Sequence, residues 1–289
     1  MTSILTNLFD GVAYGMLLFV LACGLAVTLG LMNFVNLAHG AFAMAGGYVC
    51  MLLVNQHGWP FFAALPLAFV SSAVIGIVLE RTLYRHLYAR SHLDQVLFTI
   101  GLAFMSVAAV DYIQGSSRVF INLPAALQGQ FDLLGVGIGR YRLMIIVICG
   151  LLTIGLQMVL AKTRFGSRLR AAVDDPRAAS GLGINVPQVF AFTFAFGCGL
   201  AGLGGALSAE ILGLDPYFPL KFMIYFLIVV TVGGSSSITG PFLASLLLGI
   251  GDVAGKYYVP KMGPFVIYTM MIVILIWRPN GLFGRTAAR

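Results

Sequence analysis

Three hydrogen-bonding side chains interrupt a long apolar run near the N-terminus: Asn33, Asn36 and His39, with Gly40 directly after the histidine. Amide and imidazole groups can bind a polar solute, or a backbone group, without carrying a fixed charge. In membrane proteins that move solutes, binding sites often lie where a helix is broken, because unwound backbone and helix ends supply polar groups. The stretch therefore predicts a helix break. It either lines a pathway or forms a tight turn at the inner surface, in which His39 caps the next helix.

A second polar interruption occurs late in the chain. The stretch 232–241, VGGSSSITGP, carries Ser235, Ser236 and Thr239, and we expect these hydroxyl groups to line the same pathway. Glu210 is a further candidate, because an ionised carboxylate at the centre of a bilayer costs about 2.5–3.5 kcal/mol and is rarely kept without a function. Its place near the end of an apolar segment also fits a carboxylate that reaches headgroup water.

The composition indicates whether water or lipid surrounds these polar groups. Hydrophobic residues make up 60% of the chain and charged residues 9%, and the mean hydropathy is +0.97. Soluble domains carry about 25% charged residues, so the chain is an integral membrane protein. Its apolar runs are continuous and do not alternate with polar residues, which favours helices over the strands of a membrane barrel.

The chain is predicted to be an all-α integral membrane protein with a single transmembrane domain over 1–289. A helix needs roughly 20 residues to cross a bilayer, and we expect a polytopic bundle of about eight to ten segments, some of them short or broken. The segments run approximately over 8–31, 37–54, 61–79, 96–113, 143–161, 189–212, 222–232, 241–254 and 265–277.

Basic residues predict how the chain threads the membrane, because short loops rich in Lys and Arg stay in the cytoplasm. They cluster after the third and fifth segments and at the C-terminus, which places the C-terminus inside and, with nine crossings, the N-terminus outside. The net charge of +7 is therefore a matter of topology and is no evidence for nucleic acid. The remaining basic residues fall in loops expected outside: Arg118, Arg140, Arg142, Lys221, Lys256 and Lys261.

Two loops are long enough to hold structure of their own. The outer loop, 115–142, is predicted to be a lid, a connector or a surface for a delivering protein. In the cytoplasmic loop, 162–188, the stretch DDPRAASGLG predicts a short helix with Asp175 as N-cap, Pro176 at the first helical position and Gly181 or Gly183 as terminator. So short a helix needs a partner surface, and its Ala178–Ser180 face is small enough to enter a groove. The alternative is an ordinary positively charged inner loop.

The sixth segment carries small residues at every fourth position, which predicts close helix packing. Its GCGLAG run and the later GDVAGKY lack the context or spacing of nucleotide-binding motifs, so ATP must be hydrolysed elsewhere. The four cysteines lie inside apolar segments and are interpreted as small hydrophobes. No nucleophile, metal site or acid/base pair is predicted, and the chain alone is taken to be a non-enzyme. The small residues at every fourth position of the sixth segment form a stripe, which consists of Thr193, Gly197, Ala201, Gly205 and Ala209.

Four motifs carry a family resemblance: NFVNLAHGAFAMAGGY, ERTLYRHLYARSHLDQVLFTIGLAF, TRFGSRLRAAVDDPRAASGLGIN and RPNGLFG. In order along nearly the whole chain, they resemble the permease subunits of branched-chain amino acid ABC importers and their urea and amide relatives. The resemblance implies the ABC importer permease fold, a second homologous permease, two cytoplasmic ATPases and a periplasmic solute-binding protein. It implies no cofactor on this chain, with ATP and Mg in the partner subunits.

The resemblance also implies that the inner loop holds the helix that couples to the ATPases. The implied location is the bacterial inner membrane, with membrane lipid around the bundle. The expected coupling residues are Arg164, Gly166, Arg170, Asp174, Asp175, Arg177, Ala178 and Gly183.

Two departures from the family pattern leave the solute open. Ala41 follows the His–Gly pair where many relatives have an acidic residue, and SSSITG is richer in hydroxyl groups than the related stretch. The expected cargo is a small organic solute: a branched-chain amino acid, urea, an amide or a small carboxylate. The alternatives are an ion-coupled secondary transporter that needs no ATPase and, less well supported, a membrane enzyme or sensor. Extramembrane stretches of at most about 28 residues disfavour the latter, because a small domain needs roughly 50.

Overall fold

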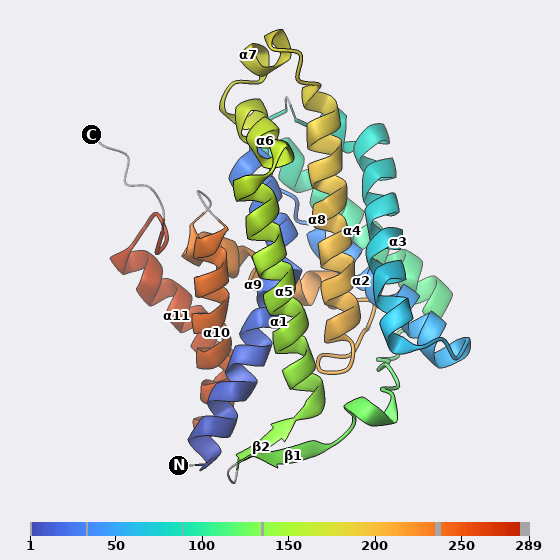
Figure 1. Ribbon diagram of the computed structural model, residues 1–289, viewed down its shortest axis with the longest axis vertical. Helices are drawn as coiled ribbons and strands as arrows, with labels where there is room; N and C mark the ends of the chain where they lie inside the picture. The colour runs from blue at the N-terminus through green and yellow to red at the C-terminus, as the bar shows by residue number, and fades with distance from the viewer. Residues whose placement is uncertain (1, 33, 89, 134–135, 235–237, 284–289) are drawn as a thin grey trace.

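The computed structural model describes residues 2–32, 34–88, 90–133, 136–234 and 238–283. These residues form a bundle of α-helices with one short β-hairpin at one end (Figure 1). The helices are α1 (Thr2–Met32), α2 (His39–Met51), α3 (Phe61–Thr82), α4 (His92–Gln114), α5 (Arg140–Lys162), α6 (Arg164–Asp174), α7 (Pro176–Gly181), α8 (Val186–Ser208), α9 (Phe218–Gly233), α10 (Thr239–Tyr258) and α11 (Gly263–Trp277). Short turns of other helix types are η1 (Leu52–Gln56), η2 (Tyr84–His86) and η3 (Ala125–Leu127).

The predicted polytopic helical bundle is confirmed. By length and composition, α1, α3, α4, α5 and α8 can each cross a membrane, whereas α9 and α11 are shorter apolar helices. Every one of the nine predicted apolar segments contains a helix. The sixth was predicted to continue to residue 212, but α8 ends at Ser208 and the chain turns at once. The second segment is helical for only 13 residues before it becomes the π-helical turn η1.

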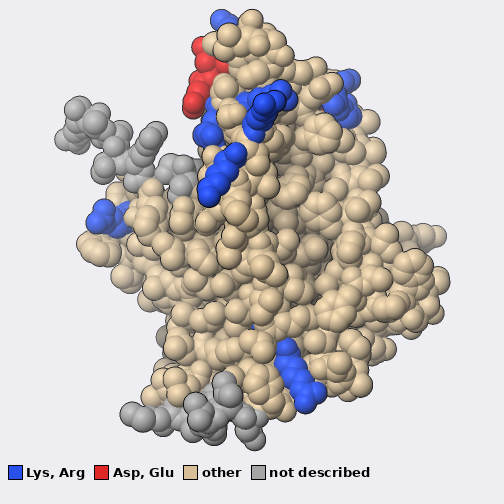
Figure 2. Space-filling model, viewed as in Figure 1, with Lys and Arg blue, Asp and Glu red and all other residues tan. Residues whose placement is uncertain are grey.

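The two ends of the bundle differ in structure. At one end, which we call the hairpin end, β1 (Gln130–Leu133) pairs antiparallel with β2 (Val136–Gly139) inside the predicted outer loop. This hairpin was missed, because the loop contains no long alternating apolar pattern. The other end, called the α6–α7 end, carries those two short helices. Figure 2 shows basic side chains gathered there, with acidic side chains beside α7.

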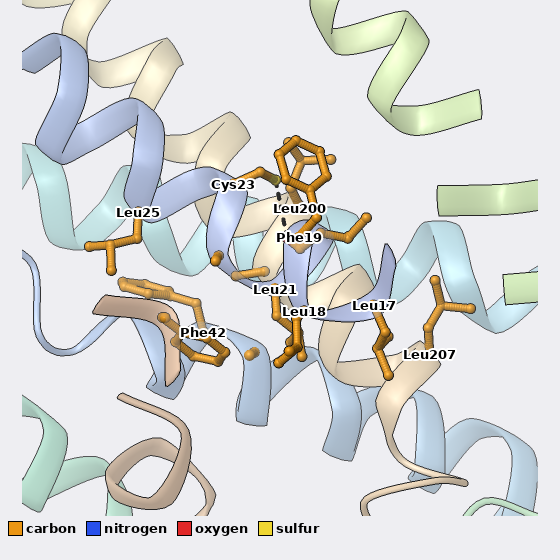
Figure 3. Close-up of a cluster of buried hydrophobic side chains, with 14 of the residues drawn as sticks. Leu17, Leu18, Phe19, Leu21, Cys23, Leu25, Phe42, Leu200 and Leu207 are labelled. Atoms are coloured by element: carbon orange, nitrogen blue, oxygen red, sulfur yellow. Dashed lines mark hydrogen bonds between the residues drawn. The ribbon is translucent and has the colours of Figure 1, made fainter. Parts of the chain in front are cut away.

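The core lies around α1 and α8. In their most apolar windows 83% and 78% of the residues are buried, against 17% for α4. Figure 3 shows leucines of α1 among side chains of its neighbours, such as Phe42 of α2 and Leu200 and Leu207 of α8. The polar Cys23 thiol donates to the Val20 carbonyl oxygen at 3.1 Å, within the same helix. The apolar α1 and α8 therefore form the centre, whereas α3, α4 and α5 present much of their apolar surface outward.

The predicted small-residue stripe is confirmed as a packing surface, since its four members on α8 and Ala209, just beyond the helix, are all buried. Gly197 lies against Gly24 of α1, and Gly205 lies against α2. A Cβ atom on Gly205 would overlap the Ala43 carbonyl oxygen, so the two backbones approach too closely for any side chain. Such contacts replace the hydrophobic driving force that lipid does not supply.

Replacing Gly205 with alanine should therefore destabilise the fold. The added methyl must displace the α2 backbone, an overpacking cost of about 1–3 kcal/mol. Gly101→Ala on α4 is the matched control, because nothing lies within 4 Å of a Cβ atom there. We expect a lower midpoint of thermal unfolding in detergent for Gly205→Ala and no decrease for Gly101→Ala. Equal midpoints would contradict the packing role of Gly205.

Candidate functional site

The first predicted helix break is present between α1 and α2. After α1 ends at Met32, the chain turns back along the same helix: the Phe34 N–H donates to the Thr28 carbonyl oxygen at 3.1 Å. Residues 34–38 then run alongside α1 until α2 begins at His39. Asn33, predicted as part of the break, lies outside the described residues.

Two side chains of α4 bind the unwound backbone. The Val35 N–H donates to Gln95 Oε1 and the Leu37 N–H to Thr99 Oγ1, both at 3.2 Å. Gln95 and Thr99 are buried. Irregular backbone is tolerated inside a membrane only where protein or water satisfies it. The sequence reasoning missed these two residues, although a polar pair four apart at the start of an apolar segment was a usable signal.

Asn36 and His39 are both buried. Asn36 Oδ1 accepts a hydrogen bond from the Tyr84 hydroxyl at 3.2 Å, and His39 Nε2 lies 3.0 Å from the Leu21 carbonyl oxygen of α1. The proposed capping role of His39 is wrong, because α2 has no side-chain cap and the ring bonds to α1 instead. Among the described residues, Asn36 Nδ2 and His39 Nδ1 have no hydrogen-bond partner.

His39 marks the middle of the bundle. A Cβ atom on Gly24 would lie 2.6 Å from His39 Cε1 and would overlap the carbonyl oxygen of Gly197, the central residue of α8. Because α8 is about 34 Å long at 1.5 Å per residue, its centre lies near mid-membrane. Helix α2 thus begins at that depth and runs toward one side only.

A second short helix begins at the same place. A Cβ atom on Gly40 would lie 2.8 Å from Cα of Pro219, in the first turn of α9. After α8 ends, residues 209–217 re-enter the bundle, where Leu214 packs on Gly47 of α2. Lys221 was expected in an outer loop, which is wrong: it lies in the first turns of α9, inside the predicted bundle. The helix starts at His39 and Phe218 therefore meet in a half-helix junction.

The described residues of the second predicted break do not line this junction. Ser235 and Ser236 lie outside the described residues. Thr239, the first residue of α10, is exposed and lines a cavity of about 360 Å³ at the α6–α7 end, together with Gly166 and Arg170. A pathway role for Thr239 thus stays a prediction, and its neighbours belong to the coupling segment.

Glu210 lies just beyond α8 at the hairpin end. It borders a cavity of about 800 Å³ whose wall includes Gln128, Tyr141 and Arg142. Partial burial raises the pKa of the Glu210 carboxyl above its usual value. The structure thus places Glu210 at the mouth of the bundle and away from the half-helix junction.

The inner loop begins with a helix that the sequence reasoning missed, α6. Thr163 caps it by accepting from the Gly166 N–H at 3.3 Å. Gly166 packs so closely on α5 that a Cβ atom would overlap the Leu160 carbonyl oxygen, and Arg170 donates to the same oxygen. Apolar residues at positions 165, 169, 172 and 173 were the missed signal, because they share one helix face.

The predicted short helix α7 is confirmed with its cap. Asp175 Oδ1 accepts from the N–H groups of Arg177 and Ala178 at 2.9 and 3.0 Å. At the other end Gly183 has a φ of 82°. The Gly183 N–H donates to the Ser180 carbonyl oxygen and the Ile184 N–H to that of Ala179. This pair of bonds is the Schellman pattern, which a glycine in the left-handed region permits.

The two helices pack with the start of α8 around a small core, made of Leu169, Ala172, Ala179, Val186 and Val189. Ala179 is buried in that core, so the predicted Ala178–Ser180 face is not wholly available to a partner. Leu182 was not predicted, yet its side chain is 82% exposed at the end of α7. The exposed surface, called the coupling surface below, consists of Arg164, Asp174, Arg177, Ala178 and Leu182.

Comparison with known proteins decides the family. The model of the branched-chain amino acid transport system permease component matches residues 7–275, nearly the whole chain. The chain belongs to this permease family.

Curated relatives are similar to this chain over two thirds or more of their own length. The high-affinity branched-chain amino acid transport system permease protein BraD of Pseudomonas aeruginosa is 28% identical, covering 97% of this permease and 96% of BraD. LivH of Escherichia coli K12 has the same identity and coverage. LivM of the same strain is 24% identical over 94% of this permease and 68% of LivM. No solved structure matches the permease.

The cap on α7 should be measurable in the permease alone. Asp175→Ala removes an acceptor for two backbone N–H groups, at a cost of about 1 kcal/mol. We expect amide hydrogen exchange across 177–182 to become roughly fivefold faster, because the helix opens more often. The neighbouring Asp174→Ala, whose side chain makes no cap bond, is the control. Equal protection in the two variants would contradict the capping role.

Proposed function

We propose that this permease is the transmembrane subunit of an ATP-binding-cassette importer, which moves a branched-chain amino acid or a related small solute inward by alternating access. The observation that carries the proposal is the α6–α7 unit. It packs on the start of α8, it is bonded directly to the end of α5, and it presents charged residues and the exposed Leu182 at its surface. A partner that displaced this unit would also move α5 and α8.

Each end of the bundle has its own proposed partners. Two cytoplasmic ATPases would bind the coupling surface and supply the sites for ATP and Mg, and a periplasmic solute-binding protein would meet the hairpin end. LivH and LivM are separately named permease proteins of one transport system, and this chain is similar to both. A homologous second permease is therefore the proposed neighbour in the membrane. This arrangement puts the C-terminus in the cytoplasm and the N-terminus outside.

The half-helix junction is the proposed centre of the pathway. Half-helix starts at mid-membrane offer backbone N–H groups and favourable dipoles to a solute. In this conformation His39 is 2% exposed, so the junction is closed. Opening would require α2 and α9 to part, and Asn36, His39 and Gly40 would then become part of the wall.

Reconstitution tests the energy source. Vesicles with this permease, a second permease, the ATPases and the binding protein should accumulate solute when ATP is supplied, whereas vesicles with the permeases alone should not. Cysteines that replace Arg177 or Leu182 should crosslink to an ATPase. A cysteine that replaces Tyr112, an exposed residue in the last turn of α4, should not. ATP-independent accumulation under an ion gradient would establish the alternative, a secondary transporter.

A substitution at the junction tests the pathway. His39→Leu replaces the imidazole with an apolar side chain of similar size that cannot bond to the Leu21 carbonyl oxygen. We expect uptake to fall by about tenfold or more while assembly with the ATPases survives, because polar groups at this depth are usually functional. His39→Gln, which retains a hydrogen-bond donor, should keep more uptake. Unchanged uptake in His39→Leu would remove His39 from the pathway.

A further inference from the structure

One ion pair lies beside the half-helix junction, on a face that the bundle does not cover. Lys221 Nζ lies 2.5 Å from Asp215 Oδ2, and the Lys221 side chain is 57% exposed whereas that of Asp215 is 11% exposed. Asp215 Oδ1 also accepts from the Tyr217 N–H at 2.9 Å, immediately before α9. The carboxylate is thus fixed to the start of α9.

The depth of this pair makes its exposure informative. Lys221 is two residues from Pro219, which touches Gly40 near the middle of the membrane. A lysine can often extend to the membrane surface, but here its ammonium group is held by the buried Asp215. Charged groups at this depth almost always face protein or water, because lipid cannot solvate them. The exposed face of α9 therefore borders either a neighbouring protein or an aqueous space in the working membrane, and thiol labelling distinguishes the two.

A buried polar group also points to a ligand near this pair. The Tyr48 hydroxyl on α2 has no hydrogen-bond partner among the described residues, although Tyr48 is only 5% exposed. The residue before Tyr48, Gly47, lies against Leu214, the residue before Asp215. A buried hydroxyl without a partner is costly, and a solute group bound at Asp215 could satisfy it.

We propose that Asp215 and Lys221 bind the two charged groups of a zwitterionic amino acid as it passes along the exposed face of α9. The solute ammonium group binds Asp215, near the Tyr48 hydroxyl. The solute carboxylate binds Lys221 at the start of α9, where the helix dipole also favours an anion. Ile224, one turn further along the face and 44% exposed, offers apolar contact for the solute side chain. This assignment rests on the proposed importer function and names the chemical class of its solute.

Thiol labelling tests the aqueous face. The four native cysteines are buried, so background labelling is low. Ile224→Cys is compared with Leu151→Cys at the centre of α5, which is 66% exposed but faces lipid in this assignment. In the assembled transporter, a charged, membrane-impermeant thiol reagent should label position 224 about tenfold faster than position 151, because only the former meets water. Equally slow labelling at both positions would overturn the proposal.

Ligand protection tests the class of solute. Leucine should slow labelling at position 224, whereas 4-methylpentanoate, which lacks the ammonium group, and 3-methylbutylamine, which lacks the carboxylate, should not at the same concentration. Protection by either single-charge analogue would overturn the assignment of two charged groups. Absence of protection by leucine in a transporter that imports leucine would overturn it as well.

Charge variants separate binding from packing. Lys221→Gln alone leaves the Asp215 carboxylate unpaired, whereas the double variant Asp215→Asn/Lys221→Gln leaves no unpaired charge. If the pair only stabilises the fold, the double variant should therefore take up more leucine than Lys221→Gln alone. If the pair binds solute, the double variant stays impaired and loses leucine protection, while assembly and basal ATP hydrolysis by the partner subunits persist. Lys221→Arg, which keeps the charge, should retain more uptake. Normal uptake by the double variant overturns this inference alone, whereas absence of ATP-driven uptake in the unsubstituted complex overturns the proposed function.

Discussion

The bundle depends on the hydrogen bonds that side chains of α4 accept from the unwound backbone between α1 and α2. In lipid, a peptide group without a partner costs several kcal/mol, so unwound backbone cannot simply lead to a helix that begins at mid-depth. The side chains of Gln95 and Thr99 accept from the Val35 and Leu37 N–H groups and remove that cost. This is why the chain can fold back along α1 and begin α2 at the centre of the bundle.

The other features of the interior follow from that fold-back. Because α2 starts at His39, the segment after α8 has room to re-enter and to begin α9 against Gly40. The contact of Gly40 with Pro219 is backbone to backbone, and the same is true where Gly205 of α8 meets α2. Interfaces of this kind are closely packed and tend to switch between discrete arrangements. Two half-helices that meet end to end at mid-depth therefore suit a protein that must open alternately to either side.

The α6–α7 unit links that interior to the membrane surface by direct bonding. Arg170 and Gly166 both meet the Leu160 carbonyl region of α5, while Ala179 packs with Val186 and Val189 at the start of α8. Helix α8 in turn packs on α1 through Gly197, on α2 through Gly205 and on α3 through Gly202. A displacement at the coupling surface thus has a continuous path of packed backbone to the half-helix junction. This continuity is a structural fact, and its use in transport is the proposal.

Particular residues show where sequence reasoning succeeded and where it failed. The cap at Asp175, the turn at Gly183 and the stripe on α8 were predicted because each depends on residues close in sequence or repeated at a fixed spacing. Helix α6 was missed although its apolar positions share one face, because basic residues dominate the stretch. The depth of Lys221 could not be predicted, since its segment resembles a loop followed by a short apolar run, and only contact with Gly40 shows that the chain re-enters.

The sequence by itself determined that this is a helical membrane protein, how its apolar segments are ordered, where local caps and turns lie and which family it resembles. These properties depend on hydrophobicity, short-range spacing and motif order, all of which are written along one chain. Only the tertiary structure decided that His39 contacts α1, that Thr239 lies beside α6 and that Asp215 and Lys221 stand next to the junction. Those facts depend on which distant backbones approach closely enough to satisfy each other, and such pairings are settled only when the whole bundle packs.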